Sequence, residues 1–108
     1  MADPGRGEVW ITDLGYAAKI RPCLVLSVPP TDTERALVSL VPHTTKPRVS
    51  RFEVPTALAF LRPGVFDAQG IVTVPRARLV RRIGVAGPEL LGDVEHAVAS
   101  WLGLTAGT

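Results

Sequence analysis

Ten glycines and ten prolines, spread along a chain of 108 residues, restrict this protein to short elements of secondary structure. Proline removes a backbone donor and glycine favours turns, so long helices and long uninterrupted strands are both disfavoured. The chain is nonetheless 46% hydrophobic, which argues against disorder and suffices for one core at this length. We therefore expect a single domain with many turns.

Short apolar segments bounded by turn residues predict a mainly β structure. The segments with strand character are 7–14, 21–28, 35–42, 51–54 and 70–74. Segment 21–28 is apolar on both faces, as in a central strand. In residues 56–66 the apolar residues recur neither at every second position, as in a strand, nor at helical spacing. We interpret this segment as one helical turn that ends at Pro63-Gly64.

The C-terminal segment contains the clearest helix signal. Pro88 suits the first helical position, Glu89 suits the first turn, and Gly103 can end the helix in a left-handed turn. Its apolar residues recur at helical spacing and are Leu90, Leu91, Val94, Ala97, Val98, Trp101 and Leu102. We expect Trp101 and the earlier Trp10 in the core. The fold class is thus mostly β or α+β: a small twisted sheet or half-open barrel with a C-terminal amphipathic helix.

Several protein classes are excluded by what the sequence lacks. No apolar run approaches the roughly 18 residues of a membrane span, and the first residues show no apolar signal-peptide core, so we expect a cytoplasmic protein. Cys23 is the one cysteine and has apolar neighbours, which favours a core residue over a nucleophile. Cys23, His43 and His96 have no paired ligand spacing, and no glycine-rich phosphate loop is present. We expect neither a metal nor a cofactor.

The charges are segregated although the formal net charge is only +2. Four basic and no acidic residues lie between Glu34 and Glu53, and four arginines and no acid lie between Asp67 and Glu89. Clustered arginine suits phosphate, because a guanidinium can contact it with two parallel hydrogen bonds. An ordinary solvated face would have the same composition, so charge alone leaves both interpretations open.

A hairpin of segments 21–28 and 35–43 would bring two polar side chains together. With Val28 opposite about Arg35, Arg21 lies opposite about Pro42, and Thr44 is its diagonal neighbour about 7 Å away at the backbone. His43 then points to the other face, unless the register shifts by one residue. A surface arginine beside a capping hydroxyl would give the same arrangement without any function.

Four sequence blocks occur in a fixed order along the chain. They are Gly7-Glu8-Val9-Trp10, Arg21-Pro22-x-Leu24-Val25-Leu26-Ser27, Val41-Pro42-His43-Thr44-Thr45 and Leu102-Gly103-Leu104. In this order the blocks resemble the MazF/PemK family of toxin endoribonucleases from type II toxin–antitoxin systems. The resemblance covers about residues 5–104 as one toxin domain and leaves 1–4 and 105–108 as tails. The first loop, Gly15 to Ile20, is shorter than is usual in that family.

The resemblance implies a fold, an activity and partners. The fold is a small barrel like that of Src-homology-3 domains, shared with CcdB-type gyrase poisons. The activity is metal-independent, sequence-specific cleavage of single-stranded RNA by attack of the 2′-hydroxyl, and the partners are a second copy in a homodimer and a cognate acidic antitoxin. The catalytic arginine and threonine of the family correspond to Arg21 and Thr44.

The residue types fit this chemistry in different ways. Arg21 can stabilise charge on phosphate oxygens and Thr44 can donate a hydrogen bond, but a guanidinium titrates above about 12 and transfers protons poorly. His43 is the residue type suited to proton transfer, and the alternative is that it positions RNA. The basic loop beside the pair predicts phosphate contacts from Lys46, Arg48 and Arg51. Two alternatives, a CcdB-like DNA gyrase poison and a non-catalytic barrel interaction module, would need neither Arg21 nor Thr44.

Overall fold

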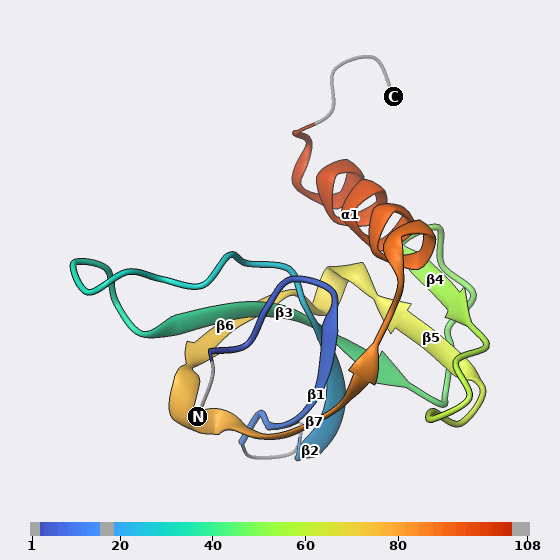
Figure 1. Cartoon of the computed structure of the whole chain (residues 1–108). Coiled ribbons are helices and arrows are strands. Elements are labelled where there is room, and N and C mark those ends of the chain that lie inside the picture. The colour runs from blue at the N-terminus through green and yellow to red at the C-terminus, as the bar shows by residue number, and fades with distance from the viewer. Residues whose placement is uncertain (1–2, 16–18, 105–108) are drawn as a thin grey trace.

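The computed structural model of the chain describes residues 3–15 and 19–104. These residues form a bent antiparallel sheet with one α-helix lying across one end of it (Figure 1). The elements are β1 (Glu8–Asp13), β2 (Ile20–Val25), β3 (Leu37–Thr44), β4 (Glu53–Thr56), β5 (Gly64–Asp67), β6 (Val72–Pro75), β7 (Leu79–Val85) and α1 (Pro88–Leu102), with 3₁₀ turns at Ala68–Gly70 and Arg76–Arg78. The predicted class, mostly β with a C-terminal helix, is confirmed. Within the described ranges, no helix is long and apolar enough to cross a membrane.

Strand β3 is at the centre of the sheet, because both of its edges pair with other strands. One edge pairs with β2, and the other pairs with β6 near the start of β3 and with β5 near its end. The strand order is β4-β5-β3-β2-β1-β7, with β6 beside β3 outside this path. Among the described strands the twisted sheet does not close, so the predicted barrel is an open one. Strand β2 is central, as its two apolar faces predict.

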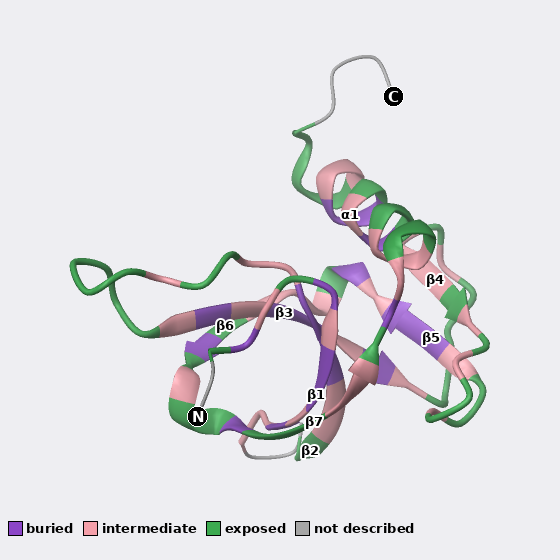
Figure 2. Cartoon of the chain, in the orientation of Figure 1, coloured by how far each residue is buried: buried purple, intermediate pink, exposed green. Residues whose placement is uncertain are grey.

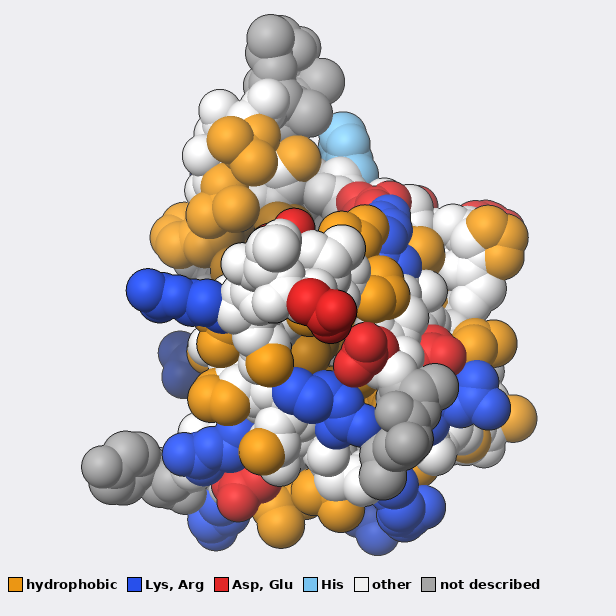
Figure 3. All heavy atoms as spheres, turned by 60° about the vertical axis from the view of Figure 1, so that its left-hand side comes forward, with side chains coloured by type: hydrophobic (Ala, Val, Ile, Leu, Met, Phe, Trp, Pro, Cys, Tyr) orange, Lys and Arg blue, Asp and Glu red, His pale blue; other side chains and the backbone are white. Residues whose placement is uncertain are grey.

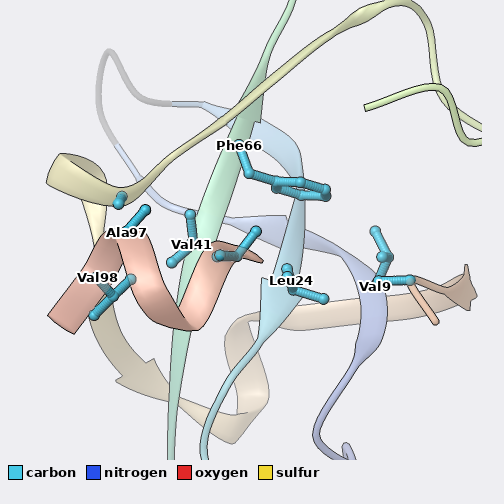
Figure 4. Close-up of a cluster of buried hydrophobic side chains, with 9 residues drawn as sticks. Val9, Leu24, Val41, Phe66, Ala97 and Val98 are labelled. Carbon is cyan, nitrogen blue, oxygen red and sulfur yellow. The ribbon is translucent and has the colours of Figure 1, made fainter. Parts of the chain in front are cut away.

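The central strands separate two hydrophobic clusters, because successive side chains of a strand point to opposite faces. Leu24 and Val41 face the cluster under α1, whereas their neighbours Cys23 and Leu40 face the second cluster. Figure 4 shows the first cluster, in which the sheet residues meet Ala97 and Val98 of the helix. Burial is concentrated along these strands and on the inner side of α1 (Figure 2). The two clusters fix the direction of the strands whose ends form the site described below.

Helix α1 begins and ends where the sequence predicts. Gly87 caps its start with φ 85°, Pro88 is its first residue, and Gly103 ends it with φ 69° while donating its N–H to the carbonyls of Ala99 and Ser100. Trp10 is buried, as expected, but Trp101 is 42% exposed, so its assignment to the core is wrong. Trp101 lies in the last turn of α1, outside the buried cluster, and its ring packs edge-to-face with Phe52 at 5.3 Å between centroids.

The middle of the chain departs from the sequence prediction. Residues 57–63 form no helix but a loop between β4 and β5 with one hydrogen-bonded turn, in which the N–H of Leu61 donates to the carbonyl of Leu58. The two strands pair as a hairpin with Thr56 opposite Gly64. Strand β7 was not among the predicted strands, because its Arg81-Arg82 pair interrupts the alternation of apolar and polar residues. The tails 1–4 and 105–108 and the first loop fall partly outside the described residues, which exclude 1–2, 16–18 and 105–108.

Candidate functional site

A cleft of about 950 Å³ lies at the end of the β2–β3 hairpin. It is bounded by the start of β2, the end of β3, the middle of β7 and the loop 57–63. Among the described residues, its lining contains six cationic side chains and no acidic one, and one of the six, Arg82, pairs with Glu8 at 3.4 Å. The cations are Lys19, Arg21, Lys46, Arg62, Arg81 and Arg82. Because like charges this close raise the local positive potential, the cleft suits an anionic ligand with several charges.

Arg21 and Thr44 both line this cleft, from neighbouring strands. The observed register pairs Cys23 with Pro42 and Leu24 with Val41, a shift of two residues from the predicted register, which placed Arg21 opposite Pro42. A two-residue shift preserves the face of every side chain. Continued outward, this register puts Arg21 level with Thr44 rather than diagonal to it. The register is compatible with the predicted convergence of Arg21 and Thr44, and both residues line the cleft.

The hydroxyl of Thr44 is oriented by the chain that follows it. The backbone N–H of Lys46 donates a hydrogen bond of 3.1 Å to Thr44 Oγ1. This side-chain-to-backbone bond uses an acceptor lone pair of the hydroxyl, so the O–H of Thr44 can still donate. The same turn places Lys46 on the cleft wall.

His43 precedes Thr44 on β3 and also lines the cleft, although little of its side chain is exposed there. It is 4% exposed and its ring meets the edge of Phe66 at 5.4 Å between centroids. Burial lowers the pKa of His43, so the imidazole is neutral near pH 7. Its Nε2 atom is buried, with no hydrogen-bond partner among the described residues.

Gly64 explains how β3 and β5 come close enough to enclose His43. A Cβ atom at position 64 would lie 2.2 Å from the carbonyl oxygen of Thr44 and 2.9 Å from Cε1 of His43. Only a residue without a Cβ fits there, so glycine is required by space rather than by φ. Gly64 thus fixes the backbone at Thr44 and covers the imidazole of His43.

The three residues of the basic loop occupy different places. Lys46 lines the cleft, whereas Arg48 and Arg51 do not. Glu53 accepts the backbone N–H groups of Arg48 and Ser50, which lowers its pKa and holds the loop in a turn. The guanidinium of Arg51 stacks over Phe52 at 4.5 Å, on the side of the molecule near α1.

Sequence reasoning missed four of the cleft cations, namely Lys19, Arg62, Arg81 and Arg82. Adjacent residues of a regular strand point to opposite faces, yet Arg81 and Arg82 both line the cleft. The register between β1 and β7 is irregular here, because it pairs Ile11 with Arg81 and Thr12 with Leu79 and so skips Val80. Such irregularities redirect side chains and are frequent beside functional sites. The acid-free run from Asp67 to Glu89 was the signal that could have identified these arginines.

The remaining titratable side chains give the site no further chemistry. Burial raises the pKa of the Cys23 thiol to about 12, so this side chain is an inert core residue. Within residues 3–15 and 19–104, no three His, Cys, Asp or Glu side chains are grouped so that they could hold a metal ion.

On the face of the molecule shown in Figure 3, acidic and basic side chains are partly separated. Most of the Asp and Glu side chains visible there lie in the middle and upper part, while most of the Lys and Arg side chains lie in the lower half.

Comparison with known proteins identifies a family over nearly the whole chain. Residues 5–102 match the family described as PemK-like, MazF-like toxins of type II toxin–antitoxin systems. This match covers the sheet and α1, and therefore every residue of the cleft.

Solved structures resemble this fold along its full length. One is an endoribonuclease in complex with its cognate antitoxin from a mycobacterial species, with a TM-score of 0.80 and 29% identity over 94% of this chain and 97% of the other. A second is the toxin MazF-mt6 of Mycobacterium tuberculosis, with a TM-score of 0.77 and 27% identity over 91% of this chain and 98% of the other. A third is MazE-MazF from Deinococcus radiodurans, with a TM-score of 0.79 and 25% identity over 97% of this chain and 100% of the other.

Proposed function

Because the chain belongs to the PemK-like, MazF-like toxins of type II toxin–antitoxin systems, we propose that it is a sequence-specific endoribonuclease acting on single-stranded RNA. The observation that carries the proposal is the cleft: among the described residues, its lining has six cationic side chains and no acidic one, and Arg21 and Thr44 both lie on its wall. A polyanion fits such a surface. Structures named as endoribonucleases share the fold, which supports RNA as that polyanion.

The proposed reaction uses the RNA itself as nucleophile. The 2′-oxygen forms a bond to the adjacent phosphorus, the bond from phosphorus to the 5′-oxygen breaks, and the products carry a 2′,3′-cyclic phosphate and a 5′-hydroxyl. Arg21 stabilises the charge that develops on the non-bridging oxygens, and the O–H of Thr44 donates a hydrogen bond to one of them. The 2′-hydroxyl proton leaves to water in the open cleft and the 5′-oxygen takes one from water. The chemistry assigned to Arg21 and Thr44 needs no metal.

Two roles for His43 follow from its residue type, and its surroundings favour one of them. Proton transfer needs a ring nitrogen that reaches the RNA, but the His43 side chain is only 4% exposed and its Nε2 is buried against Gly64. We therefore assign His43 to positioning, since its ring packs on Phe66 and sets the end of β3 from which Thr44 projects.

The cations outside the catalytic pair bind the phosphate backbone in this proposal. Lys46 contacts phosphates beside the scissile bond, and Arg48 and Arg51 contact the strand after it leaves the cleft along the loop. Contacts of this kind give salt-dependent affinity without sequence preference.

The partners of the toxin follow from the family and the charge. We propose a homodimer, acting in the cytoplasm, whose cationic clefts bind a cognate acidic antitoxin as well as RNA. Carboxylates of the antitoxin would occupy the phosphate positions, so the antitoxin competes with RNA for the cleft. Endoribonuclease and MazF relatives have been solved with an antitoxin or with MazE, which supports this partner.

The proposal is tested by offering purified protein an RNA and a DNA of the same sequence in EDTA. Cleavage of the RNA alone, with 2′,3′-cyclic phosphate ends, is the expected result, because DNA lacks the nucleophile. The rival gyrase poison, which the family match and the ribonuclease relatives do not favour, predicts intact RNA and inhibited gyrase supercoiling. If the RNA stays intact and gyrase supercoiling is also unaffected, the remaining interpretation is the non-catalytic barrel interaction module.

A further inference from the structure

Phe60, in the loop 57–63, is held at the cleft by a contact with a distant strand. A Cβ atom at Gly84 of β7 would lie 2.4 Å from Cε1 and 2.5 Å from Cζ of the Phe60 ring, so the ring rests directly on the backbone of β7. This contact fixes one side of the Phe60 ring and joins the loop 57–63 to β7, which is far from it in sequence. Glycine at position 84 is required for it, because any side chain would occupy the space of the ring.

The rest of the Phe60 ring is open to the cleft. Phe60 is 39% exposed and lines the cleft, and its neighbours Leu58 and Leu61 pack against the cluster under α1, with Leu61 also lining the cleft. Those two leucines anchor the loop in the core. An aromatic ring that is fixed on one side and exposed on the other presents an apolar surface that the fold has not covered.

The surroundings of Phe60 specify what that surface can bind. It shares the cleft with cations that suit phosphates, among them Arg62 two residues away and Arg81 on β7. Of the described residues that line the cleft, Phe60 and His43 are the two with aromatic rings, and His43 is only 4% exposed. A cationic track beside an exposed ring is the arrangement by which proteins bind single-stranded nucleic acid, with bases stacked on the ring.

We propose that Phe60 stacks on a base of the bound RNA and thereby positions the scissile phosphate between Arg21 and Thr44. This inference rests on the proposed ribonuclease function. Stacking of one base on an aromatic side chain changes affinity by about 5- to 150-fold and tolerates any base. Phe60 is therefore a positioning residue that contributes to binding, while Arg21 and Thr44 carry the chemistry.

The test separates base contacts from phosphate contacts with two uncleavable probes of equal charge. One is a hexamer of thymidylate and the other a hexamer of abasic deoxyribose phosphate. Wild-type protein is expected to bind the thymidylate hexamer more tightly by about 5- to 150-fold. Phe60→Leu is expected to remove most of this preference without changing the affinity for the abasic hexamer. Phe60→Trp is expected to restore it.

Two further variants control for an indirect effect of structure. Gly84→Ala displaces the ring and is expected to reproduce the result of Phe60→Leu, while Gly92→Ala, with nothing within 4 Å of the new Cβ, should have no effect.

The outcomes distinguish the inference from the function on which it rests. If Phe60→Leu weakens both hexamers equally, or neither, while wild-type protein cleaves RNA, stacking by Phe60 is wrong and the ribonuclease proposal stands. If wild-type protein binds neither hexamer and cleaves no RNA, the proposed function fails and the inference fails with it.

Discussion

Gly64→Ala is the substitution that most directly couples the fold to the site. The added Cβ would lie 2.2 Å from the carbonyl oxygen of Thr44, and this backbone atom cannot move aside as the end of a flexible side chain could. β5 pairs with β3 directly beside this contact, with Thr44 opposite Val65 and His43 opposite Phe66. The substitution must therefore push the two strands apart at the end of β3 that carries Thr44.

The expected loss of stability follows from the fact that the clashing atom belongs to the backbone. Overpacking of a tight site costs about 1–3 kcal/mol, and a backbone clash belongs at the upper end, about 3 kcal/mol of the free energy of unfolding. For a domain of this size that lowers Tm by roughly 12–24 °C. Displacement of Thr44 by about 1 Å should also slow RNA cleavage about 100-fold below the unfolding temperature.

The assay measures Tm and the single-turnover cleavage rate on the same preparations. Gly92→Ala is the matched control, because its Cβ enters open space on α1 and alanine favours the helix by about 1 kcal/mol. Its Tm should rise slightly and its cleavage rate should not change. A Gly64→Ala protein with wild-type Tm and wild-type rate would refute the close approach of β5 to Thr44.

Three further predictions concern charge, the cysteine and the histidine. Lys46→Gln should reduce the salt dependence of RNA binding by about 0.7 in the slope of log K against log salt, as measured by titration at several salt concentrations, and an unchanged slope would exclude a phosphate contact. The Cys23 thiol, with its pKa raised to about 12, should resist alkylation at pH 8 until the protein unfolds, and rapid labelling of native protein would contradict its burial. Because burial lowers the pKa of His43, only the unfolded chain gains this proton below about pH 6.5, so stability should fall as pH falls from about 6.5 to 5. A Tm series over that range should show the fall in wild-type protein and a smaller one in His43→Leu, and equal falls would assign the effect to other groups.

The elements that sequence predicts well are those with a strong local cause. Helix α1 has a proline at its start, a left-handed glycine at its end and an apolar stripe between them, so its limits could be predicted to the residue. The two apolar faces of β2 likewise identified a central strand, because only a strand covered on both sides can bury them.

The elements that sequence missed depend on contacts between distant segments. Residues 57–63 have no periodic signal, and their position is set by Phe60 resting on Gly84 of β7. The two-residue error in the β2–β3 register arises in the connection between these strands. The connection runs from residue 26 to residue 36, whereas strands at 21–28 and 35–42 leave only residues 29–34 for it. Arg21 and Thr44 still fell on one face, because an even shift preserves the alternation.

Some residues of the cleft could likewise be predicted from local sequence, whereas others reach it from distant segments. Arg21, Thr44 and Lys46 lie on one hairpin and its adjoining loop, so spacing along the chain could bring them together. Arg62 and Arg81 reach the cleft from a loop and a strand that no local pattern connects to that hairpin. Their contribution becomes visible only once the sheet has bent β7 and the loop 57–63 toward β2.

The cleavage rate of Arg21→Ala measures the central claim most directly. The substitution removes the cation from the wall of the cleft and leaves the other five in place. The account predicts a single-turnover rate on RNA that is about 100- to 1000-fold below wild type, with Tm nearly unchanged, since Arg21 lies at a strand end outside both core clusters. Arg35→Ala, at an exposed position away from the cleft, should cleave like wild type. Cleavage by Arg21→Ala at a near wild-type rate would contradict the assignment of this cleft as the ribonuclease site.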